Sequence, residues 1–145
     1  MADAEPISYW FTSDLFQIEP NEDDEINPRM YGKQLAVWVR QKLIEKGYEP
    51  EDVIPEDFGW LVLCSRDPYS LGVVCVSFKD YESSKPGDPP PPFDQVIWCC
   101  GILVEVPFFK GLFGKVDTAE GSTKLNADLR SIFEAEQRIS FVDPP

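Results

Sequence analysis

The sequence predicts an α+β two-layer sandwich, in which a mostly antiparallel sheet of about five strands is covered on one face by two helices. Three observations predict this class. Two long segments have apolar residues three and four apart, short β-prone apolar runs lie beside them, and three such runs follow one another in the middle of the chain. The expected element order is βαβββαβ, and 145 residues fit a single domain over residues 1–145.

The first strand is expected at about residues 7 to 12. Ile7, Tyr9 and Phe11 alternate there with polar residues, which is the pattern of a strand with one buried face. Apolar residues continue over positions 15–18, so a single strand and a hairpin are both open at this point.

The first helix is the clearest element and is predicted over residues 28–46. Asn27 is a favourable N-cap residue, Pro28 suits the first helical position, and Gly47 is a stop signal. One broad stripe of this helix is apolar and is expected to cover the sheet.

A second, smaller apolar patch on this helix comprises Met30, Val37 and Ile44. The helix also carries five basic residues against the single acid Glu45, so that an acidic N-terminal arm is followed by a basic helix. One interpretation is internal charge balance with scattered surface residues. The other is a face that binds a partner or forms a homodimer.

Two apolar runs, Trp60–Cys64 and Leu71–Phe78, are expected to pair as an antiparallel hairpin through a turn at residues 66–70. An acidic loop with two prolines, residues 49–57, leads into the first of them.

The most apolar stretch, residues 95–106, is expected to be a central strand with a β-bulge near Gly101. The segment before it, residues 82–93, is rich in proline, which cannot join a strand ladder. We therefore expect a proline-rich surface loop there.

A second helix is predicted over residues 118–136, because apolar residues recur three and four apart. Asp117 and Glu120 have the spacing of a capping box, while Gly121 weakens the first turn. A short strand at residues 139–141 is expected to follow.

Charge restricts the classes of function. The chain has 13 Lys and Arg against 26 Asp and Glu, a formal charge of -13 and a pI near 4.3, which argues against direct binding to nucleic acid or to an anionic membrane. The absence of His removes Ser–His and Cys–His nucleophiles, histidine acid/base catalysis and the commonest transition-metal ligand. A basic partner is favoured instead, and eight of the acids lie within residues 1–28.

The four cysteines, Cys64, Cys75, Cys99 and Cys100, lie mostly in apolar β-prone runs and are expected to be small buried hydrophobes in a reducing compartment. They form no C-x-x-C pair, so no metal site is expected, and no motif predicts a cofactor.

The ends of the chain, residues 1–6 and 143–145, are expected to be flexible. The N-terminus lacks a basic region ahead of an apolar run, and no stretch approaches the ~20 apolar residues of a membrane span. A cytoplasmic location is therefore expected.

Glu56 and Asp57, just before Gly59 and Trp60, could be a catalytic carboxylate pair. Consecutive residues in an extended segment diverge, so a working pair needs a turn or a third carboxylate from elsewhere. The competing interpretation is a solvated acidic loop followed by a core Trp. With no second persuasive constellation, enzymatic activity is less expected than binding.

The motif NPxxYGKxLAxW at residues 27–38, followed by PEDxGW at residues 55–60, resembles a family of small, largely uncharacterised bacterial cytoplasmic proteins. The resemblance covers roughly residues 27–60 and the ending at 129–141, and it implies a shared fold and a bacterial source but no activity. At the level of fold analogy, small acidic α+β proteins of this kind resemble immunity proteins of bacterial toxin systems.

The leading hypothesis is an acidic cytoplasmic binding module of the immunity or inhibitor type, which neutralises or escorts a basic protein partner such as a toxin or effector. The alternatives are a carboxylate-dependent enzyme and an acidic mimic of nucleic acid. The predicted partner-binding residues are acids of the 51–57 loop and aromatic anchors: Glu51, Asp52, Glu56, Asp57, Trp60, Tyr69 and Phe109.

Overall fold

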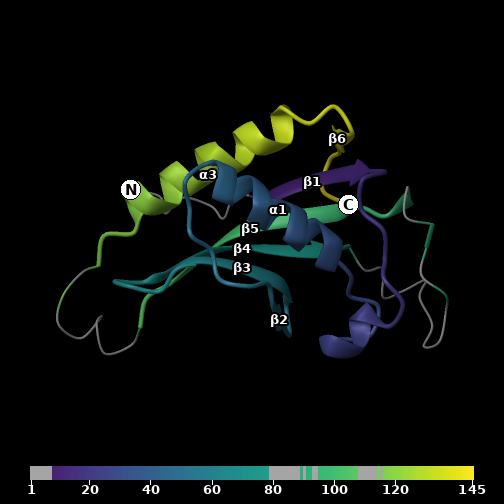
Figure 1. Ribbon diagram of the computed structural model, residues 1–145, viewed down its shortest axis with the longest axis horizontal. Helices are drawn as coiled ribbons and strands as arrows, with labels where there is room; N and C mark the ends of the chain where they lie inside the picture. The colour runs from purple at the N-terminus through teal and green to yellow at the C-terminus, as the bar shows by residue number, and fades with distance from the viewer. Residues whose placement is uncertain (1–7, 79–88, 90, 93–94, 108–113, 115) are drawn as a thin grey trace.

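Six antiparallel strands form one sheet in the described part of the chain, with two helices packed against it (Figure 1). The structure is a computed structural model that describes residues 8–78, 89, 91–92, 95–107, 114 and 116–145. In chain order the elements are β1 (Ser8–Ser13), the 3-10 helix η1 (Glu22–Glu25), α1 (Lys33–Glu45), β2 (Ile54–Glu56), β3 (Gly59–Ser65), β4 (Ser70–Ser77), β5 (Trp98–Glu105), α3 (Ala119–Glu134) and β6 (Ile139–Phe141).

The strands lie in the order β2-β3-β4-β5-β1-β6, and every neighbouring pair is antiparallel. This arrangement confirms the α+β class and the central meander of three strands. The sheet has one strand more than predicted, because residues 54–56 of the expected acidic loop pair with β3. Pro55 has no N–H to donate, which suits its place on the edge strand.

Both helices cover the same face of the sheet. The ring of Trp38 in α1 stacks on the ring of Phe133 in α3, with centroids 6.1 Å apart and planes at 11°. Phe133 also packs against Phe11 of β1, with the two ring centroids 4.9 Å apart. The apolar stripe of α1 is fully buried there at Leu35 and Leu43, as its spacing predicts. The core therefore lies between one sheet face and the two helices.

The first helix begins at Lys33, so the predicted start at residue 28 is wrong. Backbone φ is +66° at Arg29 and +144° at Gly32, and neither value is compatible with a right-handed helix. The N-cap residue is Gly32 rather than Asn27, whose side-chain amide donates to the Asp57 carbonyl oxygen at 2.7 Å.

The predicted β-bulge at Gly101 is also wrong. The β4–β5 ladder runs from Ser70 opposite Glu105 to Ser77 opposite Trp98 without a register shift. The irregularity lies instead between β3 and β4, at residues 63–65.

The second helix lies close to its predicted bounds. Asp117 accepts a hydrogen bond from the Ala119 N–H at 3.0 Å, which satisfies one free donor of the first turn. The packing explains why glycine occupies position 121 in this helix, since a Cβ atom there would overlap the Tyr69 hydroxyl. Tyr69 therefore reaches α3 only because residue 121 has no side chain.

Several predictions fall outside the described residues, namely those for residues 1–6, for Phe109 and for all of residues 82–93 except 89, 91 and 92. Where the chain is described, its helices lack the length and hydrophobicity to span a membrane.

Candidate functional site

An acidic surface is built from two segments that are distant in the sequence. One is η1, and the other is the turn between β2 and β3. The hydrogen bond from Asn27 to the Asp57 carbonyl oxygen joins them. We define the acidic end of the molecule as Asp24 and Glu25 of η1 with Glu56 and Asp57 of the turn.

Three of these four carboxylates have no ion-pair partner among the described residues. Glu25 pairs with Lys33 at 3.2 Å, whereas Asp24, Glu56 and Asp57 form no salt bridge with another described residue. Asp24 and Asp57 are exposed and Glu56 is half-buried. Their negative charge is therefore available to a molecule in solution.

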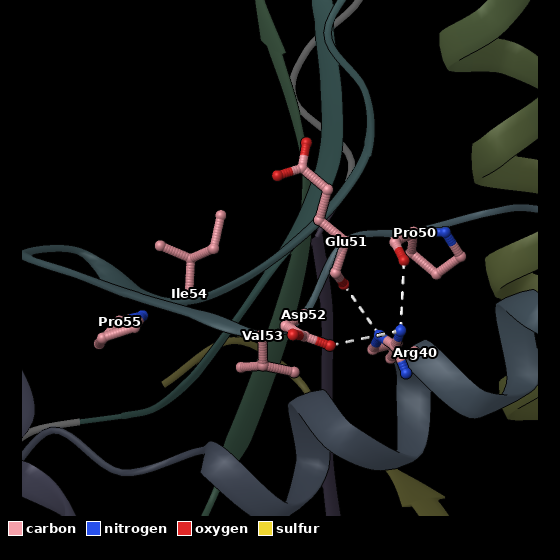
Figure 2. Close-up of a pocket in the computed structure, with 7 residues that line it drawn as sticks. All are labelled: Arg40, Pro50, Glu51, Asp52, Val53, Ile54 and Pro55. Carbon is pink, nitrogen blue, oxygen red and sulfur yellow. Dashed lines mark hydrogen bonds and ion pairs between the residues drawn. The ribbon is translucent and has the colours of Figure 1, made fainter.

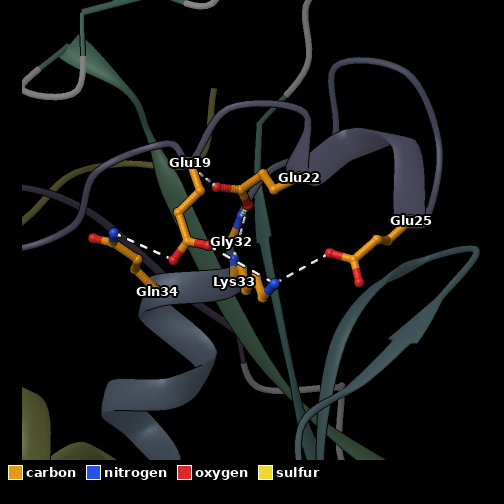
Figure 3. A network of polar contacts seen from close by, with 6 residues as sticks. All are labelled: Glu19, Glu22, Glu25, Gly32, Lys33 and Gln34. Carbon is orange, nitrogen blue, oxygen red and sulfur yellow. Dashed lines mark hydrogen bonds and ion pairs between the residues drawn. The ribbon is translucent and has the colours of Figure 1, made fainter.

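The buried carboxylate of Glu22 fixes η1 in place (Figure 3). Only 2% of this residue is exposed, and its side chain accepts hydrogen bonds from the backbone N–H groups of Glu19 at 2.6 Å, Gly32 at 3.0 Å and Lys33 at 3.0 Å. The last two N–H groups belong to the start of α1, where the helix dipole favours an anion. Glu22 thus positions the acidic segment beside the helix.

The ammonium of Lys33 contacts this network. Its ammonium lies 3.2 Å from Glu25, 3.8 Å from Glu19 and 5.6 Å from the ring centroid of Trp60. The hydrogen bond to Glu25 raises the pKa of Lys33 above its usual value. Lys33 therefore stays charged at neutral pH and neutralises part of the acidic segment.

A hollow of about 570 Å³ lies beside the edge strand β2 (Figure 2). Arg40 of α1 reaches into it and donates to the carbonyl oxygens of Glu51 at 2.8 Å and Pro50 at 3.3 Å, and it lies 3.6 Å from the Asp52 carboxylate. The lining residues are Arg40, Pro50, Glu51, Asp52, Val53, Ile54 and Pro55.

Two of the predicted partner-binding acids, Glu51 and Asp52, line this hollow, and they differ in how far their charge is neutralised by the protein itself. Both carboxylate oxygens of Glu51 accept hydrogen bonds from the Arg66 guanidinium, which lowers the pKa of Glu51. The Asp52 side chain is fully exposed apart from its long contact with Arg40. Glu51 is thus largely neutralised within the molecule, whereas Asp52 can still meet a partner.

The structure places two predicted aromatic anchors in the interior. Trp60 is 1% exposed and Tyr69 is 8% exposed, so neither offers a surface contact in this conformation. Phe58, by contrast, is 47% exposed and stands at the β2–β3 turn between the acids and Gly59. Hydrophobicity alone does not separate Phe58 from Trp60. The φ of +146° at Gly59 turns the chain and decides which ring faces inward.

Neither Glu56 nor Asp57 lines the hollow that Arg40 enters. Glu56 and Asp57 follow each other at the β2–β3 turn, and the lining of the Arg40 hollow ends at Pro55. An acid/base pair would require a concave site that excludes water around both carboxylates. Among the described residues, no group of three or more His, Cys, Asp or Glu could hold a metal ion.

The patch predicted for a homodimer is divided. Val37 and Ile44 are exposed on α1, at 53% and 38%, whereas Met30 precedes the helix and is half-buried. Val37 borders a second hollow, of about 470 Å³, that Leu15 and Trp38 also line. The homodimer itself stays a prediction.

No family model, curated protein or solved structure matches this chain. Its function therefore has to be inferred from the surfaces described above.

Proposed function

We propose that the protein is an acidic binding module that acts in the cytoplasm and neutralises or escorts a basic protein partner, in the manner of an immunity or inhibitor protein. The observation that supports this function best is the acidic end. Asp24 and the pair Glu56 and Asp57 form no ion pair within the described chain. They come from two separate segments, which the hydrogen bond from Asn27 to the Asp57 carbonyl oxygen joins.

The proposed mechanism has two stages. The formal charge of -13 attracts a basic protein over a distance set by ionic strength, which raises the association rate. Phe58, half exposed amid the carboxylates, then enters an apolar depression on the partner. An aromatic anchor surrounded by charge is a common arrangement at the centre of protein interfaces.

The experiment compares two triple variants with equal changes in net charge. Asp24→Asn, Glu56→Gln and Asp57→Asn neutralise the acidic end. Glu105→Gln, Glu120→Gln and Asp143→Asn neutralise three exposed acids elsewhere on the chain. Each form is used to capture proteins from an extract of the source organism at low and high salt, and captured proteins are identified by mass spectrometry and assayed singly.

The proposal expects a basic protein that the unmodified chain and the control variant retain at low salt. The acidic-end variant should bind this protein ~10-fold more weakly, since each exposed ion pair across the interface contributes roughly 0.2–1 kcal/mol. Phe58→Ala should raise the dissociation rate. Equal binding by the two triple variants, or retention that does not respond to salt, would contradict the proposal.

The carboxylate-enzyme alternative has less support, because Glu56 and Asp57 lie outside the hollow that Arg40 borders. The nucleic-acid mimic predicts a different partner, namely a DNA-binding protein that DNA displaces from the acidic end. The capture experiment separates it from an immunity-type complex by adding duplex DNA as a competitor.

A further inference from the structure

Two cysteines lie directly opposite each other in the centre of the sheet. Cys75 of β4 pairs with Cys100 of β5, and their side chains point to the same face. The Cys100 thiol donates a weak hydrogen bond to the Cys75 sulfur, and the two Sγ atoms are 3.5 Å apart. Both residues are fully buried beneath the helices.

The backbone already has the geometry that a disulfide requires. Directly opposed residues in antiparallel strands have Cα atoms roughly 4.5–5.5 Å apart, which lies within the range of about 4.4–6.8 Å for bridged cysteines. Closing the Sγ atoms of Cys75 and Cys100 from 3.5 Å to a bond of about 2.05 Å needs side-chain rotation and no shift of either strand.

We propose that Cys75 and Cys100 are a modification site, at which the chain forms an intrachain disulfide in exchange with a small-molecule disulfide such as oxidised glutathione. One cysteine attacks the small disulfide as its thiolate and releases one small thiol. The second cysteine then attacks the mixed disulfide and releases the other. The two protein thiols are oxidised, the small disulfide is reduced to two thiols, and the two protons end on those products.

Burial determines when this exchange takes place. The buried position raises the pKa of the Cys100 thiol, so that the reactive thiolate is scarce while the sheet is closed. An oxidant reaches the pair only when the structure opens locally. The disulfide is then enclosed by the same core, which protects it from reduction.

The other two cysteines do not share this arrangement. Cys99 points to the opposite face of β5 from Cys100, and Cys64 lies near the irregular end of β3. Burial raises the pKa of each thiol to about 11. These two residues therefore provide a matched pair of control thiols.

The fold should also favour the cross-link thermodynamically. A bond between positions 75 and 100 closes a long segment of chain, which restricts the unfolded state more than the folded one. By chain entropy alone this makes the disulfide on the order of several hundredfold more favourable in the folded protein than in the unfolded chain.

The test uses the full chain carrying Cys64→Ala and Cys99→Ala, equilibrated with reduced and oxidised glutathione in native buffer and in concentrated urea. Mass spectrometry of the intact protein and of non-reduced peptides measures the fraction that has lost two hydrogens and joins positions 75 and 100. We expect the equilibrium constant for the cross-link to be more than tenfold larger in native buffer. The rate of oxidation should rise at urea concentrations just below the unfolding transition.

The unmodified chain provides the second measurement, in which peptide mapping should find the 75–100 link as the main product. The variant Cys75→Ala, Cys100→Ala should give only glutathione adducts. A ratio of ten or less between native and unfolded equilibrium constants, or a main product that joins other cysteines, overturns the proposal.

Discussion

The Glu22 carboxylate accepts a hydrogen bond from the Gly32 N–H at 3.0 Å, although the two residues are ten positions apart. The same oxygen accepts from the Lys33 N–H, and the other oxygen accepts from Glu19 (Figure 3). One buried side chain thus connects the acidic segment η1 to the first backbone N–H groups of α1, the helix that covers the sheet. Its contribution to stability can be measured separately from any binding role.

Glu22→Ala is expected to lower the free energy of unfolding by on the order of 2–4 kcal/mol, because it leaves three backbone donors without their charged acceptor. The neighbouring Asp24→Asn changes one exposed carboxylate and should cost less than ~0.5 kcal/mol. Urea unfolding followed by circular dichroism measures both values. Equal losses for the two variants would show that Glu22 does not hold the helix start.

Gly32 brings the backbone very close to strand β4. Its φ is +144°, and a Cβ atom there would lie 2.9 Å from the Cys75 carbonyl oxygen and 3.2 Å from the Val76 Cα. Because both neighbours are backbone atoms, they cannot move aside without shifting the strand. Gly32→Ala should therefore destabilise the protein by at least ~2 kcal/mol.

Gly47 is the matched control for this substitution. It also has a positive φ, of +98°, but a Cβ atom would meet nothing within 4 Å. Gly47→Ala should cost only the backbone strain of about 1 kcal/mol. A Gly32→Ala loss no larger than that of Gly47→Ala would mean that the contact with β4 is not tight.

Gly121 and Tyr69 are expected to be energetically coupled. A Cβ atom at position 121 would overlap the Tyr69 hydroxyl, while its next nearest neighbours lie at 3.4 Å. Gly121→Ala alone should destabilise by about 1–3 kcal/mol. In a Tyr69→Phe background the same change should be neutral or stabilising by up to ~1 kcal/mol, since Ala has the higher helix propensity.

A double-mutant cycle from urea unfolding measures this coupling, and we expect at least ~1 kcal/mol. If the effects of Gly121→Ala and Tyr69→Phe on stability simply add, the Tyr69 hydroxyl is not the group that a side chain at position 121 would overlap. Tyr69 donates to the Thr118 carbonyl oxygen only at a long 3.4 Å, so loss of that bond should not obscure the result.

The spacing of apolar residues correctly predicted the strands and the helix that are defined by a local sequence pattern. The apolar runs from Trp60 and from Leu71 became β3 and β4, and the second helix lies within two residues of its expected bounds. In each of these segments, the apolar residues recur at the period of a helix or a strand and therefore form one face that is buried.

The parts that sequence reasoning missed depend on contacts between distant residues. The helix start is set by Glu22 rather than by Asn27, which contacts Asp57. Whether Phe58 or Trp60 faces solvent depends on the turn at Gly59. Neither relationship leaves a periodic pattern in the chain, so composition gave the acidity of the candidate site but not its exposed aromatic residue.

Tyr48 joins the segment after α1 to helix α3 and supplies a prediction for alkaline pH. Its hydroxyl donates to the Asp128 carboxylate at 2.6 Å and accepts from the Lys124 ammonium at 3.2 Å. Burial, followed by the bond to Asp128, raises the pKa of Tyr48 to about 12, against about 10 in the unfolded chain. The folded protein thus binds this proton more tightly than the unfolded chain does.

The sign of the effect follows from linkage. A pKa raised by folding contributes stability that is fully present below pH ~10 and is lost as the pH rises towards about 12. Unfolding free energies between pH 9 and 11.5 should therefore fall more steeply for the unmodified chain than for Tyr48→Phe, which has no proton to lose. In absorbance titrations of phenolate, Asp128→Asn should move the Tyr48 transition to lower pH, because it removes the negative charge that favours the neutral phenol. Parallel pH profiles for the unmodified chain and Tyr48→Phe would show that Tyr48 ionises alike in both states, and would place any alkaline loss of stability on other groups.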